Sequence, residues 1–333
     1  MQSVSGHRFG PRTRLLLLAV DGAAMSFAFW VLVSLALQTP SGLVFNVRGA
    51  KYSGPLTWPA EWFDLSSLSP VDRSNTYIAL MLVLTLTYLV AIYLVRRDKR
   101  RSVTAVLGGF FALFAVLFLF MPPFISRDVY SYVFYGRTMS VYHGNPYIMV
   151  PAGRPHDIIL PLIRWRHNAS VYGPLFNWLS FSITRAAGNN IALNVFGFKA
   201  LAVAFYAGCL PIVYSLTRRV SPGRENFSLA VSAWCPIVIM HICGGGHNDS
   251  LMAFFILAGF LLYRKERAFL GLLVVTVAVM IKLTAVLALA PYLVLYVRDK
   301  RGRPLPRTKR RPGRSLRPRS TGKKPPLRLL RPM

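Results

Sequence analysis

Phe124-Ile-Ser-Arg-Asp-Val-Tyr-Ser-Tyr-Val-Phe-Tyr-Gly-Arg-Thr-Met-Ser-Val-Tyr-His-Gly-Asn-Pro-Tyr147 is the stretch from which the fold can be read. It follows an apolar run that closes at Pro122-Pro123, and its first charged residues are Arg127 and Asp128. Ionised side chains are costly at membrane depth, and those that occur there usually have a function. The stretch therefore predicts a membrane protein that carries a functional acid where a spanning segment reaches water.

The same stretch predicts a short helix at the membrane–water boundary. Ser126 suits the N-cap of this helix, and Gly144–Pro146 suits its end. At helical spacing Asp128, Tyr132 and Tyr135 share one face. Asp128 lies in the first turn, where the helix dipole favours a carboxylate, and the tyrosines are typical of a segment at the interface.

Composition excludes a soluble chain of this length. The 333 residues are 54% hydrophobic and only 15% charged, and several apolar runs reach the roughly 20 residues needed to cross a bilayer. The first apolar run is longer than that of a cleaved signal peptide, which favours a retained signal anchor. The three cysteines all sit in apolar runs, so they indicate neither a disulfide framework nor a metal cluster.

Eight apolar segments predict a polytopic helical membrane protein. They lie at about 14–37, 77–95, 103–124, 191–216, 227–243, 249–263, 268–281 and 283–297. The last three are short and can tilt, break or re-enter. A further stretch, 172–187, begins at Tyr172-Gly173-Pro174 and either spans the membrane or lies in the interface.

Basic clusters predict the orientation of the segments, because cytoplasmic loops are enriched in Lys and Arg. Residues 1–13 and the cluster Arg96–Arg101 are then cytoplasmic, and the loops at about 38–76 and 125–170 are extracytoplasmic. The later basic clusters fall on the cytoplasmic side only if 172–187 does not fully cross. We therefore expect a multi-pass protein of the cell membrane whose transmembrane domain covers 14–297.

The tail 298–333 differs from the rest of the chain. From residue 300 onward it holds 14 Lys and Arg and no acid, and it is too basic and Pro-rich to pack. One interpretation is a disordered cytoplasmic tail that touches anionic lipid; the other is that it is not the native continuation, as after a shifted reading frame. The net charge of +29 suggests nucleic acid, but no aromatic residue interleaves the charges of the tail, so no nucleic-acid partner is expected.

This orientation brings three distant polar stretches to the outer side: Asp128, the Gly244–Asp249 segment and Lys282. Asp128 is either a general base that takes a proton from a substrate hydroxyl or a plain helix N-terminal acid paired with Arg127. Lys282 interrupts an apolar run, so it either faces a cavity and binds a phosphate or snorkels to the interface.

The glycines of 244–246 precede His247-Asn248-Asp249 and an apolar helix. Glycines allow close approach of backbone N–H groups, and a helix N-terminus attracts anions, so a phosphate site is one interpretation. A flexible capping turn is the other. No second His or Cys stands at ligand spacing from His247, and no metal site is predicted.

Four motifs, in this order, resemble bacterial polyprenol-phosphate-mannose-dependent α-(1→6)-mannosyltransferases, which are multi-span glycosyltransferases of the GT-C superfamily. The first is the opening stretch, with Phe124–Tyr132, Gly136-Arg137 and Gly144–Tyr147; the others are Ser170–Phe176, Gly245–Met252 and Val279–Val286. The resemblance covers about 105–297.

The resemblance implies an all-α transmembrane bundle with short interfacial helices in an outer loop. It also implies transfer of a hexose, mannose in this family, from a polyprenyl-phosphate donor to a glycan or glycolipid acceptor in contact with membrane lipid. Asp128 stands where the family's key acid belongs and would deprotonate the acceptor, with inversion at the sugar. No acidic pair suggests a divalent metal, so no cofactor is expected. Substrate-binding roles then fall to Arg127, Tyr132, Arg137, Asn145, Tyr147, Tyr172, His247, Asn248, Asp249 and Lys282.

Two other functions stay open. The family carries further spans after the lysine segment, so a C-terminally truncated, inactive glycosyltransferase is one of them. A secondary transporter that uses Asp128, Asp249 and Lys282 as a polar pathway is the other. Transporters usually contain internal repeats, and the sequence shows none, which favours the transferase.

Overall fold

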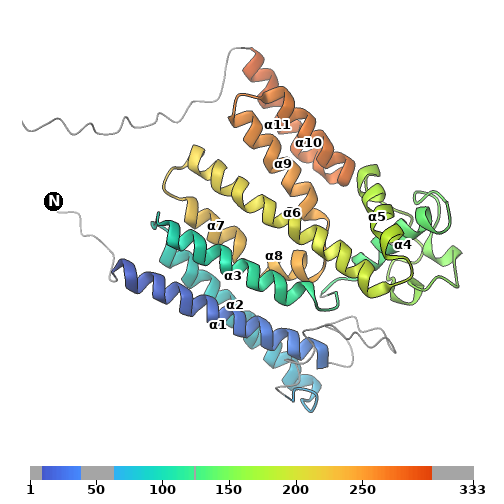
Figure 1. Ribbon diagram of the computed structural model, residues 1–333, viewed down its shortest axis with the longest axis horizontal. Coiled ribbons are helices and arrows are strands. Elements are labelled where there is room, and N and C mark those ends of the chain that lie inside the picture. The colour runs from blue at the N-terminus through green and yellow to red at the C-terminus, as the bar shows by residue number, and fades with distance from the viewer. Residues whose placement is uncertain (1–9, 39–63, 124, 302–333) are drawn as a thin grey trace, which may run out of the picture.

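A computed structural model of the chain describes residues 10–38, 64–123 and 125–301 (Figure 1). Within these ranges the regular structure is helical and contains no strand, so the predicted all-α class is confirmed. The expectations for residues 1–9, for most of the outer loop 38–76 and for the tail from 302 onward concern positions outside the described residues.

Four helices are long and apolar enough to cross a membrane: α1 (Pro11–Gln38), α2 (Pro70–Val95), α3 (Arg101–Leu119) and α6 (Ile191–Val220). They contain 28, 26, 19 and 30 residues, in line with the roughly 20 that a bilayer requires. The polytopic prediction is therefore confirmed.

The start of α2 corrects the predicted boundary at 77. The helix begins at Pro70, and the Ser69 hydroxyl caps it by accepting the backbone N–H of Asp72 at 3.2 Å. The Ser69 hydroxyl also donates to the Asp72 carboxylate at 2.7 Å. A cap extends the helix through a polar first turn, which an apolar pattern cannot reveal.

The predicted single segment 227–243 is also corrected, because it is broken. It consists of α7 (Glu225–Ala233), α8 (Pro236–Ile239) and the π-helical turn η4 (Met240–Gly244), with a bend of 52° between the two parts. Pro236 lacks the N–H that would continue the first helix, which explains the position of the break. Counted as one broken span, the pair is a fifth candidate to cross the membrane.

Three helices follow: α9 (Asp249–Arg264), α10 (Ala268–Ile281) and α11 (Val286–Lys300). Between α10 and α11 the backbone of Lys282 is extended, with φ −149° and ψ 125°, and the short 3₁₀ helix η5 (Leu283–Ala285) restarts the chain. Lys282 therefore marks a break between two helices.

The segment between α3 and α6 contains α4 (Asp128–Ser140), the 3₁₀ turns η2 (Pro151–Gly153) and η3 (Leu160–Leu162), and α5 (Pro174–Ala187). We expected α4 to present its tyrosines to the interface, but nearly all of this helix is buried. The ring of Tyr132 lies 5.0 Å from both Tyr172 and Phe176, so the aromatic face forms a protein core with α5. This packing removes apolar ring surface from water, which the interface would do only in part.

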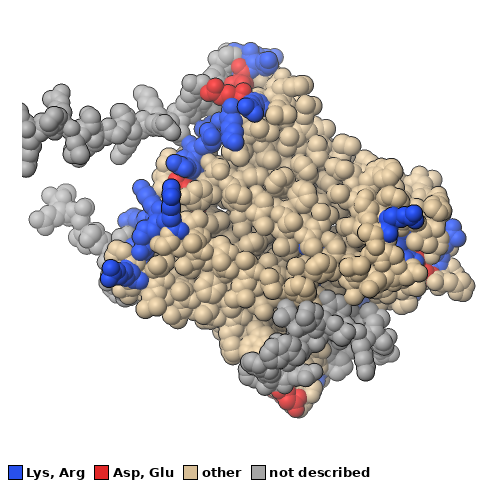
Figure 2. Space-filling model, in the orientation of Figure 1, with Lys and Arg blue, Asp and Glu red and all other residues tan. Residues whose placement is uncertain are grey.

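Figures 1 and 2 show a large group of Lys and Arg at one end of the bundle, where α1, α3, α7 and α10 begin and α2, α6, α9 and α11 end, and a smaller group at the opposite end. The Asn226 amide ties two of these ends together by donating to the carbonyl oxygens of Asp98 and Arg100 at 3.1 and 3.0 Å. Segments α4 and α5 lie at the other end. With 14 residues, α5 is about 21 Å long.

Candidate active site

Four charged or titratable side chains from three distant segments meet at the end of the bundle opposite the basic clusters. His247 Nδ1 lies 3.9 Å from Asp128 Oδ2 and 3.9 Å from Asp249 Oδ2. Lys282 Nζ donates to Asp249 Oδ1 at 2.8 Å. We call Asp128, His247, Asp249 and Lys282 the polar quartet; it joins the three stretches that the sequence placed on one side of the membrane.

The quartet is partly open to solvent. The side-chain exposures are 31% for Asp128, 43% for Asp249, 27% for Lys282 and 16% for His247. A ligand can therefore reach the carboxylates and the lysine directly, while the imidazole lies deeper between them.

Asp128 is the first residue of α4, and its two carboxylate oxygens have different neighbours. Oδ1 accepts the indole N–H of Trp165 at 3.2 Å, whereas Oδ2 faces His247. The Ser126 hydroxyl accepts the backbone N–H of Asp128 at 3.1 Å, although the N-cap position itself is Arg127 and not Ser126 as expected. One oxygen is thus held by the loop, and the other points into the quartet.

Burial, above all, lowers the pKa of His247, and the nearby Asp128 and Asp249 carboxylates oppose this shift without cancelling it. The imidazole is therefore mainly neutral at pH 7. Its Nε2 has no hydrogen-bond partner among the described residues, and its ring centroid lies 5.3 Å from that of His241 in the π-helical turn η4. Such turns are frequent at functional sites.

Asn248, between the two quartet members His247 and Asp249, is only 1% exposed. Neither the nitrogen nor the oxygen of its side-chain amide has a partner within the described residues. Buried amides are nearly always hydrogen-bonded, since an unmade bond costs about 1–3 kcal/mol. The amide therefore has unused hydrogen-bonding capacity directly beside the quartet.

Tyr132 and Tyr172 lie near the quartet, close enough for its Asp128 and Asp249 carboxylates to affect the pKa of both phenols. Burial raises the pKa of both phenols, and the Asp128 carboxylate adds to the shift, so both rings keep their protons. Tyr172 is followed by Gly173, whose backbone N–H donates to the carbonyl oxygen of Ile281 at 2.9 Å. The loop before α5 is thereby joined to the end of α10, one residue before Lys282.

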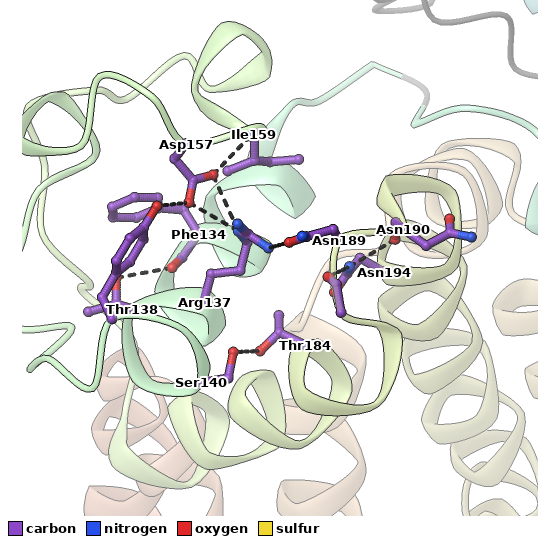
Figure 3. A network of polar contacts seen from close by, with 12 residues as sticks. Phe134, Arg137, Thr138, Ser140, Asp157, Ile159, Thr184, Asn189, Asn190 and Asn194 are labelled. Atoms are coloured by element: carbon purple, nitrogen blue, oxygen red, sulfur yellow. Dashed lines mark hydrogen bonds and ion pairs between the residues drawn. The ribbon is translucent and has the colours of Figure 1, made fainter.

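Arg137 was expected to bind substrate, but the structure places it in a different network (Figure 3). Its Nε donates to both oxygens of Asp157, at 3.1 and 3.3 Å, and a terminal nitrogen donates to the Asn189 side chain at 2.9 Å. The side chains of Arg137 and Asp157 are 4% and 0% exposed. A buried guanidinium requires such a partner, so Arg137 holds α4 to the following loop instead of joining the quartet.

Two other expected binding residues, Asn145 and Tyr147, lie in the segment that follows α4. The side-chain oxygen of Asn145 accepts the backbone N–H of Tyr147 at 2.9 Å, in an exposed turn where Tyr147 is 46% exposed. Arg127 immediately precedes α4, next to Asp128. Their roles in binding remain predictions.

Sequence reasoning missed Trp165, His241 and Lys199. Lys199 is fully buried on α6, and its Nζ donates to the carbonyl oxygens of Phe118 and Met121 where α3 ends, shortly before Asp128. The signal that singled out Lys282, a lone lysine in an apolar run, would have found Lys199 as well. Trp165 and His241 have no such signal, since their contacts depend on which segments meet.

Within the described ranges no set of three or more His, Cys, Asp or Glu side chains is arranged to hold a metal ion. The fold and the site together define a polytopic helical membrane protein with an acid–histidine–acid–lysine cluster at one end of its helices.

A family model described as "Alpha-(1->6)-mannopyranosyltransferase, N-terminal domain" matches residues 40–298, and the chain belongs to this family. Over 179 residues it is 34% identical to alpha-(1->6)-mannopyranosyltransferase A of Corynebacterium glutamicum, covering 53% of this chain and 36% of the relative. Over 198 residues it is 34% identical to the protein of the same name from Mycobacterium tuberculosis, covering 56% and 37%.

The resemblance predicted from the four motifs is therefore confirmed at the level of the family. The chain spans about a third of the length of these curated relatives. No solved structure matches the chain.

Proposed function

We propose that the chain forms the catalytic part of a membrane mannosyltransferase that moves mannose from a polyprenyl-phosphate donor to a glycan or glycolipid acceptor. Membership of the mannopyranosyltransferase family supports the reaction class. The convergence of the quartet from three segments, with an open carboxylate beside a lysine, is the observation that carries the proposal.

Asp128 acts as the general base. Its carboxylate takes the proton of the acceptor hydroxyl while the hydroxyl oxygen forms a bond to the anomeric carbon. The bond from that carbon to the phosphate oxygen breaks on the opposite face, and its electron pair leaves with the polyprenyl phosphate. The configuration at the sugar is thereby inverted.

Lys282 binds the departing phosphate, where negative charge grows in the transition state. Asp249 aims the lysine by accepting from its Nζ, and the N-terminus of α9 adds the positive end of the helix dipole. His247, mainly neutral, separates the base from the acid that holds the lysine.

The lipid part of the donor has a path next to Lys282. Leu283, Val286 and Leu287, which follow the lysine, are 68%, 45% and 78% exposed. Exposed apolar side chains at a membrane boundary suit an isoprenoid chain, so the phosphate can lie at the lysine while its tail stays in lipid. Catalysis on the extracytoplasmic side follows from the predicted orientation.

Replacement of the base tests the proposal. We expect Asp128→Asn to lower transfer of labelled mannose from polyprenyl phosphate by about 10²–10⁴-fold, the usual contribution of a general base, with membrane insertion intact. Asp64→Asn is the matched control, since this exposed acid accepts hydrogen bonds from the neighbouring Ser66 in the stretch before α2. Transfer near the wild-type rate in Asp128→Asn would remove Asp128 as the base. Uptake of a labelled mannoside into proteoliposomes, without transfer, would favour the transporter.

A further inference from the structure

Trp165 lies beside the proposed base and has no role in the mechanism above. It stands in the loop between η3 and α5, and its indole N–H donates to Asp128 Oδ1 at 3.2 Å. The residue is nevertheless 49% exposed. The N–H edge of the ring is therefore fixed at the carboxylate while much of the ring surface stays open.

The two oxygens of Asp128 divide the site into two sides. Oδ1 points to Trp165, and Oδ2 points to His247, beyond which lie Asp249 and Lys282. Attack from the face opposite the leaving group places the acceptor on the side away from the lysine that binds the phosphate. That side is the one lined by Trp165.

The chemistry of the ring indicates what binds there. The face of an indole is electron-rich, and a pyranose presents a face of C–H bonds whose hydrogens carry partial positive charge. Indole also offers a large rigid contact area with only two side-chain torsions to fix. The guanidinium of Arg164 lies over one face of the ring, 5.4 Å from its centroid, so a sugar would stack on the other face with Arg164 as a nearby donor for its hydroxyls.

We propose that Trp165 forms the acceptor subsite: its indole stacks on a neutral pyranose ring and presents one hydroxyl of that ring to Asp128. This inference rests on the proposed transfer function and names the residue that selects the acceptor. In this arrangement the quartet binds the phosphate of the donor, and the indole of Trp165 binds the acceptor sugar.

A second exposed tryptophan provides a matched comparison. Trp178 on α5 is 58% exposed, and its ring packs edge-on against Phe181 at 5.5 Å. This contact lies within α5 and involves no member of the quartet. An exposed tryptophan of this kind suits the lipid interface, so Trp178 has the same side chain and similar exposure without the neighbouring carboxylate.

The kinetic test uses Trp165→Leu, Trp165→Phe and Trp178→Leu with n-octyl α-mannopyranoside as the acceptor. We expect Trp165→Leu to raise KM for the mannoside about tenfold, or about 1.4 kcal/mol, while KM for the lipid-linked donor is unchanged. Trp165→Phe keeps an aromatic face but loses the five-membered ring with its N–H, so its acceptor KM rises less than that of Trp165→Leu. An unchanged acceptor KM in Trp165→Leu, or an equal rise in Trp178→Leu, overturns the subsite.

A binding measurement separates the subsite from the transfer function. The protein contains six tryptophans, and 5-fluorotryptophan labelling gives each a ¹⁹F resonance that single Trp→Phe variants assign. We expect methyl α-mannopyranoside to shift the Trp165 resonance and not that of Trp178. If the Trp165 resonance shifts but no mannose is transferred, the subsite is supported and the proposed reaction is contradicted. If mannose is transferred, the resonance does not shift and the acceptor KM of Trp165→Leu is unchanged, the subsite alone is contradicted.

Discussion

At the scale of single residues, His247 is set between opposing influences. Burial lowers its pKa, the Asp128 and Asp249 carboxylates raise it, and His241 and Lys282 lower it further; burial contributes most. A neutral imidazole can donate through one nitrogen, and Nδ1 lies equally far from the two carboxylates. His247 can therefore support either acid without adding a fixed positive charge between them.

This pKa shift predicts how stability depends on pH. The folded-state pKa of His247 lies below the unfolded value of about 6.5, so below that pH the unfolded chain binds a proton that the folded chain does not. The contribution of His247 to stability is thus lost as pH falls through the unfolded value of about 6.5 toward the lower folded-state pKa. We expect the thermal unfolding midpoint of detergent-solubilised protein to fall less over this range in His247→Gln than in wild type.

His143 gives the control for that experiment. It is exposed in the turn after α4 and, within the part of the chain that the structure describes, makes no contact with the quartet. His143→Gln should keep the wild-type dependence on pH. If His247→Gln keeps it too, burial does not govern the protonation of His247.

At the scale of elements, the break between α10 and η5 positions the lysine. A continuous helix would bond the carbonyl oxygen of Ile281 within itself; here that oxygen accepts the backbone N–H of Gly173. A Cβ on Gly173 would collide with the carbonyl oxygen of Met280, so no larger residue fits this approach. This hydrogen bond and the close approach at Gly173 therefore hold the loop with Tyr172 against the break with Lys282, a contact that we call the joint.

We expect Gly173→Ala to separate the two segments and to lower transfer about tenfold or more, because small misplacements of catalytic groups have large effects on rate. Mannosyl transfer and the yield of folded protein in detergent are measured together. Gly153→Ala is the matched control in the same loop, since a Cβ there meets no atom within 4 Å. Wild-type transfer in Gly173→Ala would show that the joint does not position Lys282.

Lys199 joins elements in a comparable way. Its ammonium group is buried on α6 and donates to two carbonyl oxygens at the end of α3, where the helix dipole favours a cation. The chain leads from this point through Pro122-Pro123 to Asp128. The direction in which the segment with Asp128 leaves the bundle thus depends on a contact between α3 and α6, two helices far apart in the sequence.

At the scale of the whole molecule, charge divides the bundle into two ends. The larger group of Lys and Arg lies along one edge of the bundle, with a smaller group at the opposite end (Figure 2). The quartet joins the start of α4, the start of α9 and the break after α10, away from the larger basic group. Since Lys and Arg accumulate on the cytoplasmic side, the quartet is expected to face the extracytoplasmic side. A lipid-linked donor and an acceptor of the cell envelope would then meet the base on the same side.

Cysteine labelling tests this orientation. In intact cells a membrane-impermeant maleimide should label Tyr147→Cys, near the α4 end, and should label Lys265→Cys, between α9 and α10, only after permeabilisation. The wild-type protein is the background, since Cys209 and Cys243 are buried and Cys235 is partly buried. The reverse pattern would place Asp128 in the cytoplasm and exclude an extracytoplasmic reaction.

Local patterns in the sequence predicted much of the fold. The apolar runs predicted the spans, because crossing a bilayer requires length and hydrophobicity that are visible in one dimension. The break at Lys282 and the glycines before His247 marked the segments that form the site, since a charge or a helix breaker inside an apolar run conflicts with its surroundings. Asp128 stood out for the same reason.

Pairing between distant side chains was not visible in that pattern. From the sequence, Arg137 cannot be told apart from an arginine that binds phosphate. Its buried ion pair forms with Asp157, 20 residues later, and is visible only in the folded structure. The burial of α4, the indole of Trp165 at the base and the clamp of Lys199 on α3 also depend on which segments meet in space. Hydrophobic length is a property of consecutive residues, whereas desolvation and the satisfaction of a buried charge depend on neighbours that folding brings together.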